Sequence, residues 1–382
     1  MVVEPNAKRY RLTFFQRLHA RLLRDGIELK VLYSNLYKPG TEKQDNIDFP
    51  AEFATKVSGR WMFRNRVFFQ SVWRQVLDAD LVVVDQGTKY VVNYPIMMAS
   101  LLGLKRVAFW GHGRNRQALN PDSFPERVKR ATLNATNWWF AYTAGTAAYL
   151  LANGVPRNKI TVVQNAADTD EFRAQIAEIT GGEVQAIRAE LGLSQDAKIG
   201  LFCGGIYPDK RIRFLLESAR LAKRALPEFH LIILGSGPDS HLAETAAREE
   251  SWIRYLGPKF AKEKARYFKV ADAFLMPGLV GLAILDAFAA GLPVITSDLP
   301  IHSPEIEYLE NGRNGLMTAH SHEAYSEAVL QLYRNPALLE YLRRGASDSS
   351  RRYSIEAMVD NFHDGIRKCL DGAGEQLRKI TT

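Results

Sequence analysis

Short apolar runs alternate with amphipathic stretches along most of this chain. In its first part, the apolar runs predict strands at 29–33, 81–84, 106–110 and 138–142. Between them, 12–23 places Phe15, Leu18 and Leu22 on one face of a predicted helix, and 95–102 predicts another helix. Strands that alternate with helices are typical of βαβ units, so the pattern predicts a parallel sheet covered by helices.

The same alternation restarts after a polar interval. The interval, 168–198, contains Gly181-Gly182 and a polar helical segment at 184–191, and we interpret it as an interdomain linker. Strands are then predicted at 199–203, 229–234, 253–256, 273–276 and 293–296. Helices are predicted at 212–224, 240–249, 261–269, 282–290, 323–334, 336–347 and 354–370.

Length and composition favour a two-domain globular protein. The chain has 382 residues, enough for two hydrophobic cores. We place the first domain at 1–178, together with a C-terminal helix at about 354–372, and the second at 186–353. No apolar run approaches the roughly 20 residues of a membrane span, and the first residues lack the pattern of a signal peptide. With Cys203 and Cys369 interpreted as free thiols, we expect a cytoplasmic protein.

Positive charge is concentrated in the first domain. Residues 1–135 contain 22 Lys and Arg against 12 Asp and Glu, a net charge of +10, whereas the whole chain carries +8. Three interpretations compete: an anionic membrane surface, nucleic acid, or a solvated face. No nucleic-acid-binding motif accompanies the charge, so we favour peripheral contact with an anionic membrane or a lipid-linked acceptor, and we expect no nucleic-acid partner.

The most informative stretch is a βαβ unit near the end of the second domain. An apolar strand enters a turn with Gly278 and Gly281, a helix follows, and a second strand begins soon after Gly291. A glycine turn at a helix N-terminus allows backbone N–H groups and the helix dipole to meet an anion. The sequence therefore predicts a phosphate or diphosphate site at this turn.

The segment resembles the donor-site motif of family-4 glycosyltransferases, which are retaining enzymes of the GT-B fold. The likeness lies in Gly-Leu-Val-Gly-Leu at 278–282, Gly-Leu-Pro-Val-Ile at 291–295, and Pro-Glu-Ile followed by Asn-Gly and Asn-Gly-Leu at 304–316. It implies two Rossmann-like, doubly wound α/β domains that face a cleft, with the last helix crossing back to the first domain. The donor would be a nucleoside-diphosphate sugar, such as a UDP- or GDP-sugar.

The resemblance assigns candidate donor contacts in the second domain. Lys210 matches a lysine that reaches the diphosphate, although Gly205 replaces an arginine that does so in the family. A surface lysine at a helix start is the alternative for Lys210, but that position disfavours a cation unless an anion is bound. The donor-binding candidates are Gly204, Gly205, Lys210, Gly235, Gly237, Lys259, Phe260, Gly278, Leu279, Val280, Gly281, Leu282 and Asp286.

Both acidic positions of the family motif are altered here. Asp286 replaces a glutamate that holds the ribose hydroxyls, and its alternative role is to stabilise a helix N-terminus. Gly278 replaces a glutamate that contacts the transferred sugar. This glycine is consistent with a deoxy or otherwise unusual sugar, with a substitute carboxylate from Glu305 or Glu307, or with lost activity.

In the first domain the resemblance points to the loop after the predicted strand at 106–110. His112 matches a histidine that faces the reacting sugar, so we predict His112, Lys210 and Asp286 as catalytic residues. Arg9, Arg11, His112 and Arg114 are predicted acceptor contacts, with Arg116 as a further candidate.

We expect a hexosyl- or deoxyhexosyltransferase that retains anomeric configuration and requires neither metal nor cofactor. Its acceptor would be a glycan or lipid-linked molecule, in the setting of bacterial polysaccharide or lipopolysaccharide assembly. A non-catalytic nucleotide-sugar-binding protein and a GT-B nucleotide-sugar epimerase are the alternatives.

Overall fold

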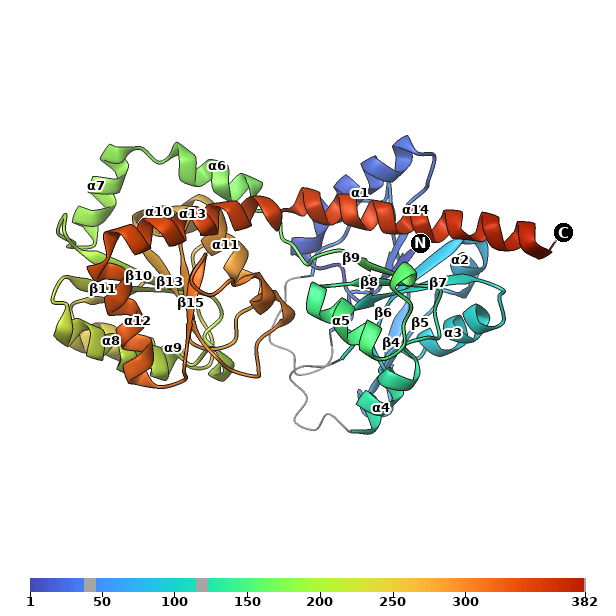
Figure 1. The fold of residues 1–382 in the computed structure, drawn as a ribbon, viewed down its shortest axis with the longest axis horizontal. Coiled ribbons are helices and arrows are strands. Elements are labelled where there is room, and N and C mark those ends of the chain that lie inside the picture. Colours follow the sequence, from blue (N-terminus) through green and yellow to red (C-terminus); the bar gives the residue numbers. More distant parts are fainter. Residues whose placement is uncertain (38–45, 115–122, 381–382) are drawn as a thin grey trace. The chain divides into compact units, whose positions relative to one another are not determined.

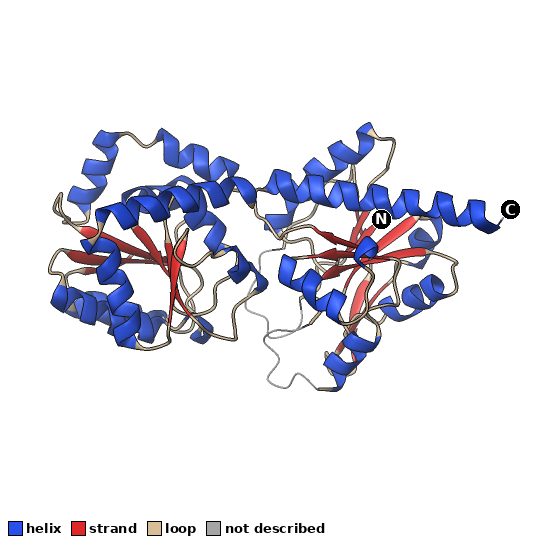
Figure 2. Cartoon of the chain, in the orientation of Figure 1, coloured by secondary structure: helices blue, strands red, loops and turns tan. Residues whose placement is uncertain are grey.

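The computed structural model describes residues 1–37, 46–114 and 123–380, and it divides into two compact units. Unit 1 contains residues 1–167 and 355–382, and unit 2 contains residues 168–354. Figure 1 shows the elements of each unit and Figure 2 their helices and strands. None of the helices in the described segments is long and apolar enough to cross a bilayer.

Unit 1 is built on a parallel sheet of seven strands in the order β3-β2-β1-β6-β7-β8-β9. The strands are β1 (Val2–Val3), β2 (Val31–Tyr33), β3 (Ala54–Lys56), β6 (Leu81–Asp85), β7 (Arg106–Gly111), β8 (Trp138–Ala141) and β9 (Ile160–Val162). A separate antiparallel hairpin consists of β4 (Gly59–Met62) and β5 (Val67–Gln70). The order reverses direction between β1 and β6, which makes this pair the topological switch point of the sheet.

Helices cover this sheet and bring the C-terminus of the chain back to it. They are η1 (Arg9–Arg11), α1 (Leu12–Arg24), α2 (Trp73–Asp78), α3 (Asn93–Leu101), α4 (Phe124–Ala131), α5 (Ala144–Ala152), η2 (Arg157–Lys159) and α14 (Ile355–Ile380). Phe362 of α14 is fully buried, and its ring stacks on Phe140 at 4.1 Å and lies 5.3 Å from Phe14 of α1. This packing confirms the prediction that the last helix returns to the first domain.

Unit 2 has a six-stranded parallel sheet in the order β12-β11-β10-β13-β14-β15. Its strands are β10 (Lys198–Cys203), β11 (Phe229–Leu234), β12 (Ile253–Tyr255), β13 (Ala273–Leu275), β14 (Val294–Ser297) and β15 (Gly315–Thr318). Its helices are α6 (Asp170–Glu178), α7 (Gly181–Glu190), η3 (Pro208–Lys210), α8 (Ile212–Ala225), α9 (Ser240–Glu249), α10 (Ala261–Val270), α11 (Ala283–Ala289), η4 (Pro304–Tyr308), α12 (His322–Arg334) and α13 (Pro336–Arg352). The strand order reverses between β10 and β13, which makes this pair the topological switch point of the second sheet.

The interval predicted as a linker belongs to unit 2, and the helical segment predicted within it at 184–191 falls on α7. Thr180 and Glu183 form a capping box at the start of α7, which explains why a helix begins at a glycine pair. Phe172 of α6 packs edge-on against Phe268 of α10 at 5.1 Å. Because α6 and α7 pack on α10, unit 1 ends at Ala167 rather than near residue 178, and unit 2 begins earlier than predicted.

Candidate functional site

The loops that leave β10 and β13 meet at the switch point of unit 2. Gly200 pairs with Ala273 and Leu201 with Phe274, so both strands end at the same edge of the sheet. The backbone N–H of Leu279 donates to the carbonyl of Asp209 at 2.8 Å, and the ammonium of Lys210 donates to the carbonyl of Leu279. The predicted lysine loop and the predicted glycine turn are therefore in direct contact.

Gly278 is needed for this contact. A Cβ atom on Gly278 would lie 2.2 Å from the carbonyl oxygen of Asp209 and 2.7 Å from the Cα of Lys210. The space beside Gly278 is thus filled by backbone of the protein itself, and a side chain at this position requires the 208–211 turn to move. Glu305, proposed as a substitute carboxylate, is buried in η4 with 4% of its surface exposed.

The loop after β11 packs against the loop after β10 at the same edge of the sheet, and glycines allow the close approach. Gly235 has a φ of +132°, and a Cβ atom there would lie 1.8 Å from the carbonyl oxygen of Gly204. Ile206 donates its N–H to the carbonyl of Ser236 at 2.9 Å, and Gly237 donates to the Ser240 hydroxyl at 2.8 Å. The loops containing Gly204, Gly235 and Gly237 are therefore held against each other by backbone contacts that a larger residue would prevent.

Asp286, on α11, is paired with a residue that the sequence did not indicate. Its carboxylate lies 3.0 Å from the ammonium of Lys264 on α10, and both side chains are partly exposed. Lys264 also lies over the Phe172 ring, 4.2 Å from its centroid. Burial raises the pKa of the nearby Cys203 thiol to about 12, with opposing effects from Lys264 and Asp286. A ribose at Asp286 would have to share the carboxylate with Lys264.

Lys259 and Phe260 precede α10 at the predicted nucleobase position. Lys259 is ion-paired with Glu263, one turn along the helix. Phe260 is exposed, with 76% of its surface accessible. An exposed ring at this edge is available to stack on a planar ligand.

His302 holds the glycine turn from the opposite side and was missed by the sequence analysis. The N–H of Val280 donates to its Nδ1 at 3.0 Å, and its Nε2 lies 2.7 Å from the carbonyl of Ser297. These two bonds define a neutral ring with the proton on Nε2. Burial, with 4% of the residue exposed, lowers the pKa of His302 below its usual range. No local motif marks His302, because its partners come from two other loops.

In unit 1, the predicted acceptor residues differ in their surroundings. Arg9, His112 and Arg114 are exposed, whereas Arg11 is buried with 5% of its surface exposed. The His112 ring lies 4.1 Å from the Tyr142 ring, and Arg114 lies over Tyr149 at 5.2 Å. Arg116 falls outside the described residues.

Arg11 is fixed by aromatic neighbours rather than by an ion pair. Its Nη2 donates to the Tyr142 hydroxyl at 2.8 Å, and its guanidinium carbon lies 4.0 Å from the centre of the Trp110 ring. Two carboxylates nearby were also missed by the sequence analysis. Burial raises the pKa of Glu4 to about 7, and burial also raises the pKa of Asp85.

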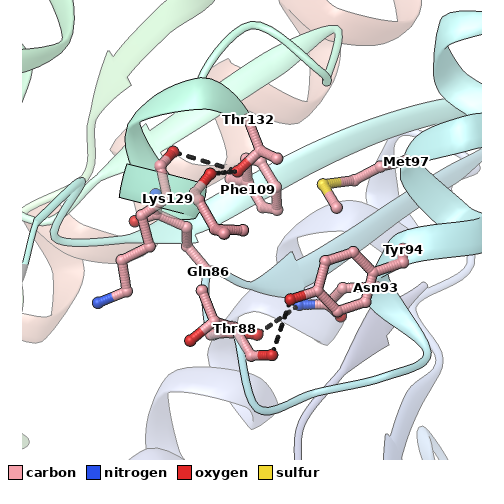
Figure 3. Close-up of a pocket in the computed structure, with 10 residues that line it drawn as sticks. Gln86, Thr88, Asn93, Tyr94, Met97, Phe109, Lys129 and Thr132 are labelled. Atoms are coloured by element: carbon pink, nitrogen blue, oxygen red, sulfur yellow. Dashed lines mark hydrogen bonds between the residues drawn. The ribbon is translucent and has the colours of Figure 1, made fainter. Parts of the chain in front are cut away.

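A small pocket is lined in part by the loop that follows β6, including Gln86 and Thr88 (Figure 3). The Asn93 amide donates to the carbonyl of Asp85 at 2.8 Å. The Tyr94 hydroxyl donates to the carbonyl of Thr88 at 2.9 Å (Figure 3). These bonds brace the loop after β6 and so fix the backbone of Asp85.

Comparison with known proteins finds a family that the second half of the chain resembles. A family model described as "Glycosyl transferases group 1" matches residues 197–335. Residues 197–335 therefore resemble a glycosyl transferases group 1 domain. All predicted donor-site residues, from Gly204 to Asp286, lie inside this domain, whereas Arg9, Arg11, His112 and Arg114 lie outside it.

Curated proteins that are similar to this chain include two synthases of glycosylated diacylglycerols. The alpha-monoglucosyldiacylglycerol synthase of Acholeplasma laidlawii is 25% identical over 206 residues, covering 52% of this chain and 51% of the relative. The alpha-galactosylglucosyldiacylglycerol synthase of Streptococcus pneumoniae is 27% identical over 229 residues, covering 57% of this chain and 58% of the relative. The chain thus spans about half the length of the curated relatives it matches.

Solved structures extend the likeness in fold to nearly the whole chain. The crystal structure of Anabaena HepE in complex with UDP has a TM-score of 0.67 and 14% sequence identity, covering 96% of this chain and 98% of that one. The predicted GT-B fold is confirmed by this likeness and by the parallel sheets of the two units.

Proposed function

We propose that the protein transfers a sugar from a nucleoside-diphosphate sugar, such as a UDP- or GDP-sugar, to a glycan or lipid-linked acceptor. The observation that carries this proposal is the meeting of the Lys210 loop and the glycine turn at the switch point of a domain that resembles the group 1 family. Ligands of open α/β sheets bind at such a point. Relatives that make glycolipids, and a neighbour that binds UDP, support the same substrate classes.

In this proposal, unit 2 binds the diphosphate and stabilises it as a leaving group. The Lys210 ammonium, which is bonded to the Leu279 carbonyl, would turn to a phosphate oxygen. The N–H groups of Leu279 and Val280 are already bonded to Asp209 and His302, so they hold the turn in shape and are not free to bind phosphate. Asp286 would hold the ribose and Phe260 would face the base.

We further propose that the sugar is transferred with retention of configuration and without a metal ion. The departing diphosphate would accept the acceptor proton, so no strong protein base is required, and Lys210 would offset the charge that develops on the phosphate. Chelation by EDTA should then leave the turnover unchanged. Activity that EDTA removes and Mg²⁺ restores would contradict this part of the proposal.

The exposed basic residues of unit 1 support peripheral contact with the inner face of the cytoplasmic membrane, where a lipid-linked acceptor would be found. The presence of Gly278 and Gly205 in place of charged family residues favours the alternative of a nucleotide-sugar-binding protein without activity.

Incubation with a panel of UDP- and GDP-sugars separates the candidate functions. A transferase releases free nucleoside diphosphate when an acceptor is present. An epimerase produces a new sugar nucleotide, and a binding protein returns every donor intact. Release of nucleoside diphosphate supports the proposal, and either of the other results contradicts it.

Lys210→Ala tests the donor site itself. Loss of a charge-assisted contact should weaken nucleoside-diphosphate binding by about 1.5–3 kcal/mol. Lys198 is a matched control, because it lies at the opposite end of β10. Calorimetry with UDP and GDP should show a loss for Lys210→Ala and none for Lys198→Ala. Equal affinity in both variants would remove Lys210 from the site.

A further inference from the structure

The second switch point of the molecule, between β1 and β6 of unit 1, brings together side chains that no local motif links. Val3 pairs with Val84, so Glu4 and Asp85 follow side by side on neighbouring strands. Asp85 in turn pairs with Trp110 on β7. Paired residues of neighbouring parallel strands share a face of the sheet, so the three side chains form one row at its C-terminal edge.

Arg11 lies over this row, and one of its guanidinium nitrogens forms no hydrogen bond with a described residue. Nη2 is bonded to Tyr142, but Nη1 is buried and has no hydrogen-bond partner among the described residues. The indole Nε1 of Trp110, a residue only 2% exposed, is also buried, and no described residue accepts a hydrogen bond from it. Buried donors of this kind are costly unless a ligand or water accepts from them.

The carboxyl groups of Glu4 and Asp85 also lack hydrogen-bond partners among the described residues. Glu4 and Asp85 are partly exposed, and no hydrogen bond or ion pair from a described residue reaches either carboxyl group. Each carboxyl nevertheless senses the charge of Arg11, which lowers its pKa against the larger effect of burial. Arg11 is therefore close enough to act electrostatically on both carboxyls but forms a contact ion pair with neither.

We propose that Glu4, Asp85 and Arg11 bind an uncharged polyhydroxylated group, a sugar ring or a cyclitol, as the part of the acceptor that enters unit 1. A hydroxyl group both donates and accepts, so vicinal hydroxyls satisfy the carboxylates and Arg11 Nη1 together. A phosphate could accept from Arg11, but Glu4 and Asp85 would repel it whenever these carboxyls are ionised. This inference rests on the proposed transferase function and narrows its acceptor.

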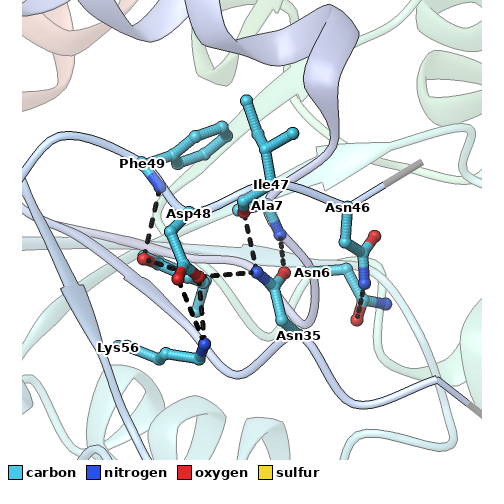
Figure 4. Close-up of polar contacts among 9 residues, drawn as sticks. Asn6, Ala7, Asn35, Asn46, Ile47, Asp48, Phe49 and Lys56 are labelled. Carbon is cyan, nitrogen blue, oxygen red and sulfur yellow. Dashed lines mark hydrogen bonds and ion pairs between the residues drawn. The ribbon is translucent and has the colours of Figure 1, made fainter. Parts of the chain in front are cut away.

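The loop between Glu4 and Arg11 is held in place by a polar network, shown in Figure 4. The side-chain oxygen of Asn35 accepts from the N–H of Ala7 at 2.8 Å, and its amide donates to the carbonyl of Ile47 at 2.7 Å and to Asp48 at 3.2 Å. Asn46 donates to the side chain of Asn6 at 3.1 Å. A loop fixed in this way presents its ligand groups without an ordering cost on binding.

The test measures the binding of small sugar and cyclitol probes to the full chain by saturation-transfer NMR. The probes are methyl α-glucopyranoside, methyl α-galactopyranoside and myo-inositol, together with glucose 6-phosphate and inositol 1-phosphate as their charged counterparts. Glu4→Gln and Asp85→Asn keep the shape of each side chain and remove its charge. Asp78→Asn is the control, because Asp78 is an exposed carboxylate before β6, at the opposite edge of the sheet.

At least one uncharged probe should bind more tightly than its phosphate. Each amide variant should weaken that binding about tenfold or more, whereas Asp78→Asn should not change it. Tighter binding of the phosphates, or unchanged binding in both amide variants with folding intact by circular dichroism, would overturn the inference. If polyol binding behaves as expected but no donor is ever consumed, the binding site stands and the transferase proposal fails.

Discussion

At the scale of single residues, Gly278 has a packing role that is independent of sugar selection. The backbone of Asp209 and Lys210 occupies the space that a side chain would need. Restoring the family glutamate here would therefore displace the lysine loop as well as add a carboxylate. A Gly278→Glu variant cannot separate sugar selection from this packing effect.

A smaller substitution tests the packing role. Gly278→Ala should destabilise unit 2 by about 1–3 kcal/mol and weaken nucleoside-diphosphate binding, because the 208–211 turn must move away. Gly281→Ala is a matched control in the same turn, since its Cβ would lie no closer than 3.7 Å to Ser303. Thermal unfolding and calorimetry measure both effects. Equal behaviour of the two variants would show that the turn moves freely.

Glu4 predicts a pH dependence of stability. Its pKa in the folded protein is about 7, against an ordinary value of 4.5, so folding favours the protonated form. The ionised carboxylate therefore costs stability, fully above about pH 7 and not at all below about pH 4.5. Glu4→Gln should be more stable than the parent by about 1–3 kcal/mol above pH 7, and this gain should vanish below pH 4.5.

Denaturant unfolding at several pH values measures this difference. The exposed Asp78→Asn variant should follow the parent at every pH. A gain that Glu4→Gln retains at acid pH would not come from ionisation of this carboxyl, and the account of Glu4 would then be wrong.

At the scale of elements, His302 connects three segments of unit 2. Its ring accepts a hydrogen bond from the N–H of Val280 in the turn after β13 and donates one to the carbonyl of Ser297, the last residue of β14. His302 itself lies shortly before η4. Because its folded pKa is lowered, protonation is disfavoured in the native state. The contribution of His302 to stability should therefore fall as the pH decreases below the ordinary value of 6.5.

His302→Leu removes both hydrogen bonds and leaves the Val280 N–H unpaired. The free energy of unfolding should drop by about 1–3 kcal/mol, and nucleoside-diphosphate binding should weaken because the turn loses its support. His241→Leu is the control, because His241 is exposed on α9 and bonds only within its own turn, at 3.2 Å from the Pro238 carbonyl. Unchanged nucleotide affinity in His302→Leu would assign His302 a purely structural role.

Elements with a strong local pattern could be predicted from the sequence. The apolar run at 229–234 coincides with β11, and the helix predicted at 12–23 is α1 within one residue. The two-residue strand β1 and the hairpin β4–β5 could not, because they are too short or too mixed to show a period. The capping box at Thr180 is visible in the sequence, but the polar composition of α7 favours a linker when no tertiary contact is known.

The residues of the candidate site also fall into two groups, those with a local sequence motif and those without one. Lys210 follows the end of β10 and the glycine turn follows the end of β13, and each could be found from its own local motif. Glu4, Asp85 and His302 could not, because strand register and loop contacts alone bring them to their partners. Side chains that meet only through tertiary contacts carry no signal in their sequence spacing.

At the scale of the whole molecule, charge predicts how the protein meets a membrane. The net charge of +10 over residues 1–135 should hold it weakly to anionic bilayers in a salt-sensitive way. The tip of the β4–β5 hairpin exposes Phe63 beside Arg64 and Arg66. In vesicle flotation, the paired change Arg64→Glu and Arg66→Glu should reduce binding to anionic vesicles at low salt. Binding that does not depend on lipid charge or salt would show that the basic residues are a solvated surface and do not contact the membrane.

The central claim is sugar transfer from a donor that is held by unit 2. It is tested most directly by product analysis after incubation with a nucleotide sugar and an uncharged glycoside acceptor. The account predicts one sugar added to the acceptor for each nucleoside diphosphate released, with the anomeric configuration of the donor preserved in the NMR spectrum. Donors recovered intact, or converted to another sugar nucleotide without a glycosylated product, would contradict it.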